Sequence, residues 1–70
     1  MTLYTQHALE KMDGLGIEQR DVERALKTGM KWKETASEKW HAQQAGIEVV
    51  FMKQGKQLVV ITVYLAGRTK

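Results

Sequence analysis

Residues 57–65, with the sequence QLVVITVYL, form the longest uncharged apolar run of the chain. β-Branched and aromatic side chains dominate this run, which suits a strand on a pleated surface. A strand that is apolar on both faces belongs inside a sheet, and the run is too short to cross a membrane as a helix. Read with a period of two, one face carries the hydroxyls of Thr62 and Tyr64. The other face is aliphatic, with Val59, Ile61, Val63 and Leu65, and we expect it to pack against helices.

The size of the chain limits it to one small domain over residues 1–70. A chain of this length buries only about 60% of its unfolded surface, so we expect marginal stability. It contains no cysteine, which excludes disulfides and thiolate metal sites. The first residues do not resemble a charged and then apolar leader. We therefore expect a cytoplasmic protein that does not associate with a membrane.

Two helices are expected in the first half of the chain. Thr5 is suited to cap a helix that covers residues 6–12, and the glycine-containing segment 13–16 ends it. Ile17 and Val22 have the spacing of a hydrophobic staple around a second helix start near residue 18. This second helix should end at Gly29. Leu3-Tyr4 is open to two interpretations, a short strand or an extended lead-in.

From Met30 onward the apolar pattern changes from helical to alternating, which predicts strands at 30–35, 38–44, 47–53 and 57–65. The connections are short, so neighbouring strands should be antiparallel. Turns at 36–37 and 45–46 would place Glu34 opposite Lys39 and Trp40 opposite Phe51. The predicted fold class is α+β, with two N-terminal helices packed on a four-stranded antiparallel sheet and a possible short extra N-terminal strand. The expected core consists of Leu9, Met12, Val22, Leu26, Trp40, Val49, Phe51, Ile61 and Val63.

The register of the last hairpin has two solutions. A three-residue turn at 54–56 pairs Val49 with Ile61 and points the aliphatic face at the helices. A two-residue turn shifts the register by one and points Thr62 and Tyr64 there instead. We favour the three-residue turn because the aliphatic face makes the better core.

The charge is unevenly distributed along the chain. Residues 1–28 hold four basic and five acidic side chains, whereas residues 29–70 hold seven basic and three acidic ones. A polyanion should therefore prefer the C-terminal half. Trp32, His41, Thr62 and Tyr64, with Lys39 and Arg68 nearby, would form a basic aromatic surface that stacks bases and holds phosphates. Competing interpretations are an ordinary soluble surface and lysines that protect short edge strands from aggregation.

The two histidines are the candidate acid–base groups. His7 falls in the first turn of the expected helix, where the dipole favours a neutral imidazole that can act as a base. His41 should lie opposite Trp32 on the sheet face away from the helices. Alternative roles are a surface histidine for His7 and a cross-strand packing partner for His41. The spacing fits no metal site, and the sequence has no phosphate loop or nucleotide fingerprint, so we expect neither metal nor cofactor.

Four ordered segments resemble the bacterial family known as domain of unknown function 4258. They are YTQHALEKM at 4–12, Gly-Ile at 16–17, Asp-Val at 21–22 and Ile-Thr-Val-Tyr at 61–64. The family is similar to RelE-like and barnase-like toxin folds, which are mostly metal-independent ribonucleases. The resemblance implies two helices on a curved antiparallel sheet and RNA as a substrate. It also matches His7 to a helix-one histidine, and Thr62 and Tyr64 to a polar pair on the last strand.

The leading functional hypothesis is therefore an RNA-acting domain, a metal-independent endoribonuclease or a degenerate relative of one. Its catalytic candidates are His7, Lys11, His41 and Tyr64, and its RNA-binding candidates are Trp32, Lys39, Thr62 and Arg68. The family often has arginine near Lys11, and lysine loses the bidentate grip on phosphate. Two alternatives are a non-catalytic RNA- or ribosome-binding module and a protein-interaction domain that pairs with a cognate partner through a strand edge. If the helices cover one sheet face and Tyr64 points from the other, His7 can reach Tyr64 only at the rim or around a curled edge. A site shared by the two therefore requires either strong sheet curvature or the alternative register.

Overall fold

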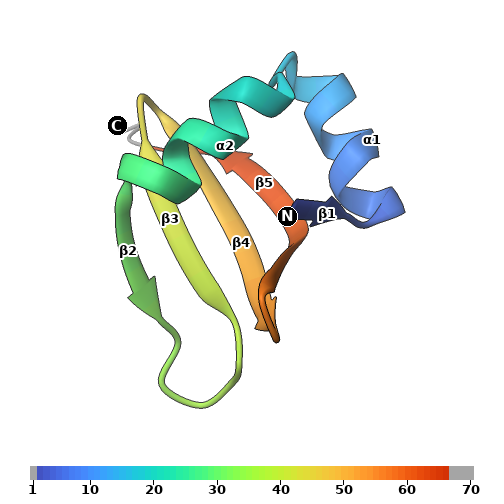
Figure 1. Cartoon of the computed structure of the whole chain (residues 1–70). Coiled ribbons are helices and arrows are strands. Elements are labelled where there is room, and N and C mark those ends of the chain that lie inside the picture. The colour runs from blue at the N-terminus through green and yellow to red at the C-terminus, as the bar shows by residue number, and fades with distance from the viewer. Residues whose placement is uncertain (1, 67–70) are drawn as a thin grey trace.

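A computed structural model describes residues 2–66 and contains two helices and a five-stranded mixed sheet (Figure 1). The elements are β1 (Thr2–Tyr4), α1 (Gln6–Leu15), α2 (Gln19–Thr28), β2 (Met30–Lys33), β3 (Trp40–Gln44), β4 (Ile47–Gln54) and β5 (Gln57–Leu65). The strand order is β1-β5-β4-β3-β2, with β1 parallel to β5 and every other neighbouring pair antiparallel. The α+β prediction is confirmed, Leu3-Tyr4 belongs to a strand, and β5 lies inside the sheet.

Both helices start and stop where local sequence signals place them. The Thr5 hydroxyl accepts a hydrogen bond from the Ala8 amide at 3.0 Å, and Gly16 ends α1 in the left-handed conformation with φ 71°. Glu18 and Asp21 form a reciprocal capping box at the start of α2. Within residues 2–66, neither helix is long and apolar enough to cross a membrane.

The two helices take different positions on the sheet. α2 crosses one face and contacts β3 and β4, whereas α1 lies beside β5 beyond the end of β1 (Figure 1). The end of α2 comes very close to β3, because a Cβ on Gly29 would lie 2.5 Å from the Ala25 carbonyl oxygen and 2.8 Å from that of Gln43. Glycine is therefore required at position 29 because a larger side chain would clash there, and not because of its backbone angles.

The core lies between the helices and one sheet face. It consists of Ala8, Met12, Ile17, Val22, Ala25, Leu26, Ala42, Val49, Phe51, Val60 and Val63, with Trp40 packed against its border. The prediction that Leu9 is a core residue was wrong, since 40% of it is exposed. α1 stands beside the sheet instead of lying across it, and it turns only a narrow face, with Ala8 and Met12, toward the core.

The register of the last hairpin differs from the favoured prediction. The turn has two residues, since Gln54 pairs with Gln57, and Val49 pairs with Val63 instead of Ile61. A β-bulge at Ile61 adds one residue to β5, because Phe51 pairs with Val60 but Val50 pairs with Thr62. The bulge resets the alternation along β5. As a result Val60 and Val63 reach the core, while Val59 and Ile61, which we expected there, are only partly buried.

The same bulge keeps Thr62 and Tyr64 on the sheet face opposite α2. Thr62 pairs with Val50 and Tyr64 pairs with Glu48, and both partners alternate with the core residue Val49 along β4. We call this face the open face. The expectation that Thr62 and Tyr64 point away from the helices is therefore correct, although the register that produces this differs from the favoured one.

Candidate functional site

The first turn of α1 is fixed against the bulged part of β5. The Thr5 amide donates to the Val60 carbonyl at 3.0 Å, and the Thr5 hydroxyl donates to the Ile61 carbonyl at 2.9 Å. α1 therefore begins beside residue 61 and continues along the edge of β5. This arrangement follows from the shortness of β1, which leaves the second half of β5 without a strand on that side.

Lys11 and Tyr64 meet at this edge. The Lys11 ammonium nitrogen lies 5.6 Å from the centre of the Tyr64 ring, within the range of a cation–π contact. His7 lies one helical turn before Lys11, on the same side of α1, and is exposed. We call His7, Lys11 and Tyr64 the rim site. The contact of Lys11 with Tyr64 shows that α1 reaches the sheet edge where Tyr64 lies.

A second group of functional candidates surrounds His41 on the open face. His41 Nε2 lies 2.6 Å from a Glu34 oxygen, and His41 Nδ1 lies 2.7 Å from a Glu48 oxygen. The Trp32 ring stacks on the imidazole with centroids 5.1 Å apart and planes within 4°. The predicted pairing of Trp32 with His41 is confirmed. We call these four residues the His41 cluster.

The two carboxylates determine the charge state of His41. Burial by itself would lower the pKa of this imidazole, but the hydrogen bonds with Glu34 and Glu48 raise it above the ordinary value. The hydrogen bonds from His41 and then Ser37 lower the pKa of Glu34. A protonated imidazole donates from both nitrogens, which matches one carboxylate on each side. His41 therefore links Glu34 and Glu48, and neither of its ring nitrogens is free to take a proton from a substrate.

Thr62 lies on the open face but beneath its surface. Only 8% of the residue is exposed, and its hydroxyl finds no hydrogen-bond partner among residues 2–66. Tyr64, two residues further along β5, is 46% exposed. Of the two last-strand candidates, Tyr64 is thus the one whose side chain a ligand can reach.

The remaining predicted RNA-binding residues are scattered. Trp32 is 38% exposed, and Lys39 is exposed near the Glu34 carboxylate, which it helps to keep ionised. Arg68 lies outside the described residues. The structure thus brings Lys11 to Tyr64 and Trp32 to His41, in two groups that adjoin at Glu48, the cross-strand partner of Tyr64.

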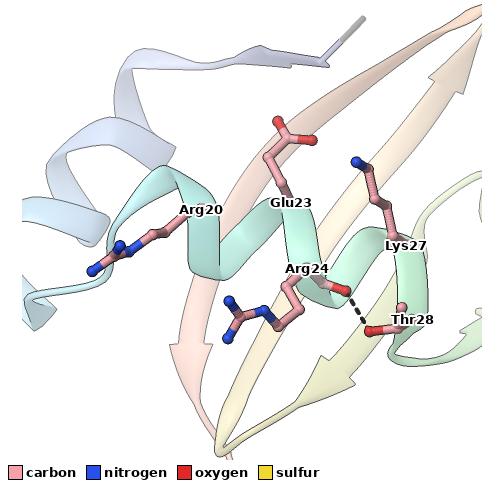
Figure 2. A pocket seen from close by; sticks show the side chains of 5 residues that line it. All are labelled: Arg20, Glu23, Arg24, Lys27 and Thr28. Atoms are coloured by element: carbon pink, nitrogen blue, oxygen red, sulfur yellow. Dashed lines mark hydrogen bonds between the residues drawn. The ribbon is translucent and has the colours of Figure 1, made fainter.

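A shallow hollow of about 370 Å³ lies on the outer surface of α2 and is lined by Arg20, Glu23, Arg24, Lys27 and Thr28 (Figure 2). The Glu23 carboxylate accepts a hydrogen bond from the Tyr4 hydroxyl at 3.0 Å and another from Thr2 at 3.3 Å. Burial and this carboxylate together raise the pKa of Tyr4 far above its ordinary value. The alignment of the basic residues on one helix face was visible in the sequence, whereas the contact of Glu23 with β1 was not.

The described part of the chain contains no cluster of side chains suited to bind a metal ion. Across residues 2–66, histidine, aspartate and glutamate side chains form no group of three that could hold an ion. In the His41 cluster the carboxylates occupy opposite nitrogens of the imidazole, so the three side chains do not converge on one point.

Comparison with known proteins gives one finding. The family described as Domain of unknown function (DUF4258) matches residues 4–65, which include the rim site and the His41 cluster. Neither the curated proteins nor the solved structures contain a significant match. The match covers nearly the whole chain.

Proposed function

We propose that this chain, which belongs to the DUF4258 family, binds RNA at the rim site and cleaves it without a metal ion. The observation that carries the proposal is the contact of the Lys11 ammonium with the Tyr64 ring at 5.6 Å. It joins the two chain segments, in α1 and β5, whose residues resemble a ribonuclease-like family. The likeness to RelE-like and barnase-like folds is part of this proposal.

The rim site offers the groups that RNA transphosphorylation needs. His7, exposed in the first turn of α1, takes the proton of a ribose 2′-hydroxyl. The 2′-oxygen then attacks the adjacent phosphorus, and Lys11 stabilises the negative charge that develops on the phosphorane oxygens. The 5′-oxygen leaves and takes a proton from solvent. The products are a 2′,3′-cyclic phosphate and a new 5′-hydroxyl end, and Tyr64 holds a neighbouring base by stacking.

His7 suits the role of base better than His41. Both ring nitrogens of His41 are engaged by carboxylates at 2.6 and 2.7 Å, and its side chain is only 14% exposed. Two carboxylates beside it would also repel the phosphate of a substrate. His7 has an exposed ring next to a cation in Lys11, which attracts that phosphate.

The test is incubation of purified protein with single-stranded RNA in the presence of a chelator. Wild type should produce fragments with cyclic phosphate ends, and His7→Ala should reduce the rate by about 10²–10⁴-fold, as expected for a lost acid–base group. Lys11→Ala should also reduce the rate, whereas Lys11→Arg keeps the charge. Gln6→Ala is the matched control, because Gln6 is the exposed neighbour of His7 and its side chain bonds only Glu10 within residues 2–66.

The outcomes separate cleavage from binding. Intact RNA after prolonged incubation with wild type would reject the catalytic proposal. Salt-dependent binding without cleavage would support the non-catalytic RNA-binding alternative, since phosphate contacts weaken steeply with added salt. Equal cleavage by His7→Ala and wild type would remove His7 from the mechanism.

One observation favours the alternative of a protein-interaction domain. β2 is an edge strand, and all four of its residues, Met30–Lys33, are exposed. An edge of this kind can accept a strand from a partner protein. Binding that persists in high salt and protects the β2 amides from hydrogen exchange would support this function over RNA binding.

A further inference from the structure

We infer that the outward face of the Trp32 indole is a stacking subsite for one base of single-stranded RNA. The inference rests on the proposed RNA binding and extends it from the rim site to the opposite end of the open face. The ligand class is a nucleobase on a flexible strand, held by its π-face and not by its hydrogen-bonding edge.

The pairing of strands leaves one face of the indole uncovered. Trp32 and His41 are direct cross-strand partners on β2 and β3, and their rings are parallel within 4°. His41 therefore covers one face of the indole. β2 is the last strand of the sheet in the described part of the chain, so no further strand covers the other face.

The platform is rigid because the ring behind it is fixed. Two carboxylates hold the His41 imidazole from opposite sides, and the Glu34 carboxylate is itself held by the Ser37 hydroxyl at 2.8 Å. Trp32 packs against this fixed ring while remaining 38% exposed. A base that stacks on a preorganised indole pays little for ordering the protein side.

One lysine near the platform can hold a phosphate that flanks a stacked base. Lys39 is exposed and precedes His41 by two residues, on the same face as His41 and Trp32. Lys31 and Lys33 alternate with Trp32 along β2 and point to the other face, where they contact the Gly29 carbonyl and Glu38. The Glu34 carboxylate points inward to His41 and is not presented to a base in front of Trp32. The subsite should therefore accept any base, with stronger binding for bases that stack better.

The open face connects this subsite to the rim site. The register joins Trp32, His41, Val50 and Thr62 in one row across β2, β3, β4 and β5. Three inter-strand spacings of about 4.8 Å place the two ends of this row about 14 Å apart. Tyr64 of the rim site follows Thr62 by two residues on β5, so the subsite and Tyr64 lie on the same face. The Glu34 and Glu48 carboxylates lie between them, and a strand that occupies both sites must keep its phosphates away from this pair.

The experiment measures binding of an oligoadenylate made of 2′-O-methyl nucleotides, which lack the 2′-hydroxyl needed for cleavage. Trp32 fluorescence is followed in a Trp40→Phe background, because Trp40 is the second tryptophan of the chain. The oligoadenylate should quench this fluorescence. The affinities of the variants, including those without Trp32, are compared by the fluorescence anisotropy of a dye-labelled oligoadenylate. By this measure Trp32→Ala should weaken binding by about 5- to 150-fold, the equivalent of one stacked base. Trp32→Phe should recover part of the affinity.

Two controls isolate stacking from charge and from damage to the fold. Met30→Ala alters a side chain on the same strand and face that is more exposed than Trp32, and it should bind like wild type. A strand of equal length without bases keeps the phosphates and should bind Trp32→Ala and wild type equally. Thermal unfolding of each variant reports whether the fold survives.

The outcomes distinguish this inference from the proposed function. Equal binding by Trp32→Ala and wild type, or equal binding of the strands with and without bases, would overturn the subsite. If wild type binds no RNA at all, the proposed function and the subsite both fall. Quenching of Trp32 by the oligoadenylate, in a protein whose wild type cleaves no RNA, would keep the subsite and remove only the catalytic proposal.

Discussion

Replacing Thr62 by valine should stabilise the protein, because the Thr62 hydroxyl is buried without a partner. The residue is 8% exposed, and its oxygen makes no hydrogen bond within residues 2–66. Burying a hydroxyl without a partner costs about 1–3 kcal/mol. Valine keeps the shape and the β-branching that suit a strand and removes the polar group. We therefore expect Thr62→Val to raise the free energy of unfolding by about 1–3 kcal/mol.

The matched control is the same substitution at Thr5, where the opposite sign is expected. The Thr5 hydroxyl accepts from the Ala8 amide at 3.0 Å and donates to the Ile61 carbonyl at 2.9 Å. Thr5→Val should lower the free energy of unfolding by about 0.5–2 kcal/mol through loss of the helix cap, and the uncapped Ile61 carbonyl adds to this loss.

Urea denaturation and thermal unfolding, both followed by circular dichroism, measure these changes. In a domain of this size each kcal/mol shifts the melting temperature by about 4–8 °C. If Thr62→Val is destabilised to the same degree as Thr5→Val, the Thr62 hydroxyl has a partner in solution. Thr62 would then not be an unpartnered hydroxyl on the open face.

Two further predictions concern the glycines and the His41 cluster. Gly14→Ala should raise the free energy of unfolding by about 0.5–1 kcal/mol, because Gly14 lies inside α1 with open space around it. Gly29→Ala should lower the free energy of unfolding, because the added Cβ would be forced against two carbonyl oxygens. Chemical denaturation of both variants measures the two changes. The raised pKa of His41 means that its stabilisation is complete below the unfolded value of 6.5 and is lost as the pH rises through the folded value. The lowered pKa of Glu34 means that its stabilisation is complete above 4.5 and is lost as the pH falls through the folded value. Wild type should therefore lose stability as the pH rises above 6.5 through the folded pKa of His41, and an equal loss in His41→Gln would refute the assignment.

The sequence by itself determined the elements and most of their boundaries. A helix cap such as Thr5 acts through hydrogen bonds within one helical turn. The hairpin turn at Ala45-Gly46 needs positive φ angles, and the two residues adopt φ values of 56° and 80°. Such signals act over a few residues, so they can be recognised without the fold. The same holds for the opposition of Trp32 and His41, since a short turn fixes the register of a hairpin.

The composition of each candidate site was only partly accessible from the sequence. His7, Lys11 and Tyr64 could be selected individually, but the contact of Lys11 with Tyr64 depends on α1 lying beside β5 instead of across the sheet. Of the two carboxylates on His41, Glu34 follows the end of β2 and Glu48 belongs to β4. Glu48 reaches His41 only because β3 pairs with β4 in the observed register. Long-range geometry of this kind has no local signature.

Only the tertiary structure decided the faces of β5. Its two-residue turn begins with Gly55 at φ 60°, and this turn alone would have pointed Thr62 at the helices. The bulge at Ile61 adds one residue to β5 and so exchanges the two faces of the residues that follow it. As a result Val63 enters the core and Tyr64 remains on the open face. A bulge forms when the turn and the core require registers that differ by one residue. The alternating pattern of residues 57–65 fits either register, so packing against the helices had to choose between them.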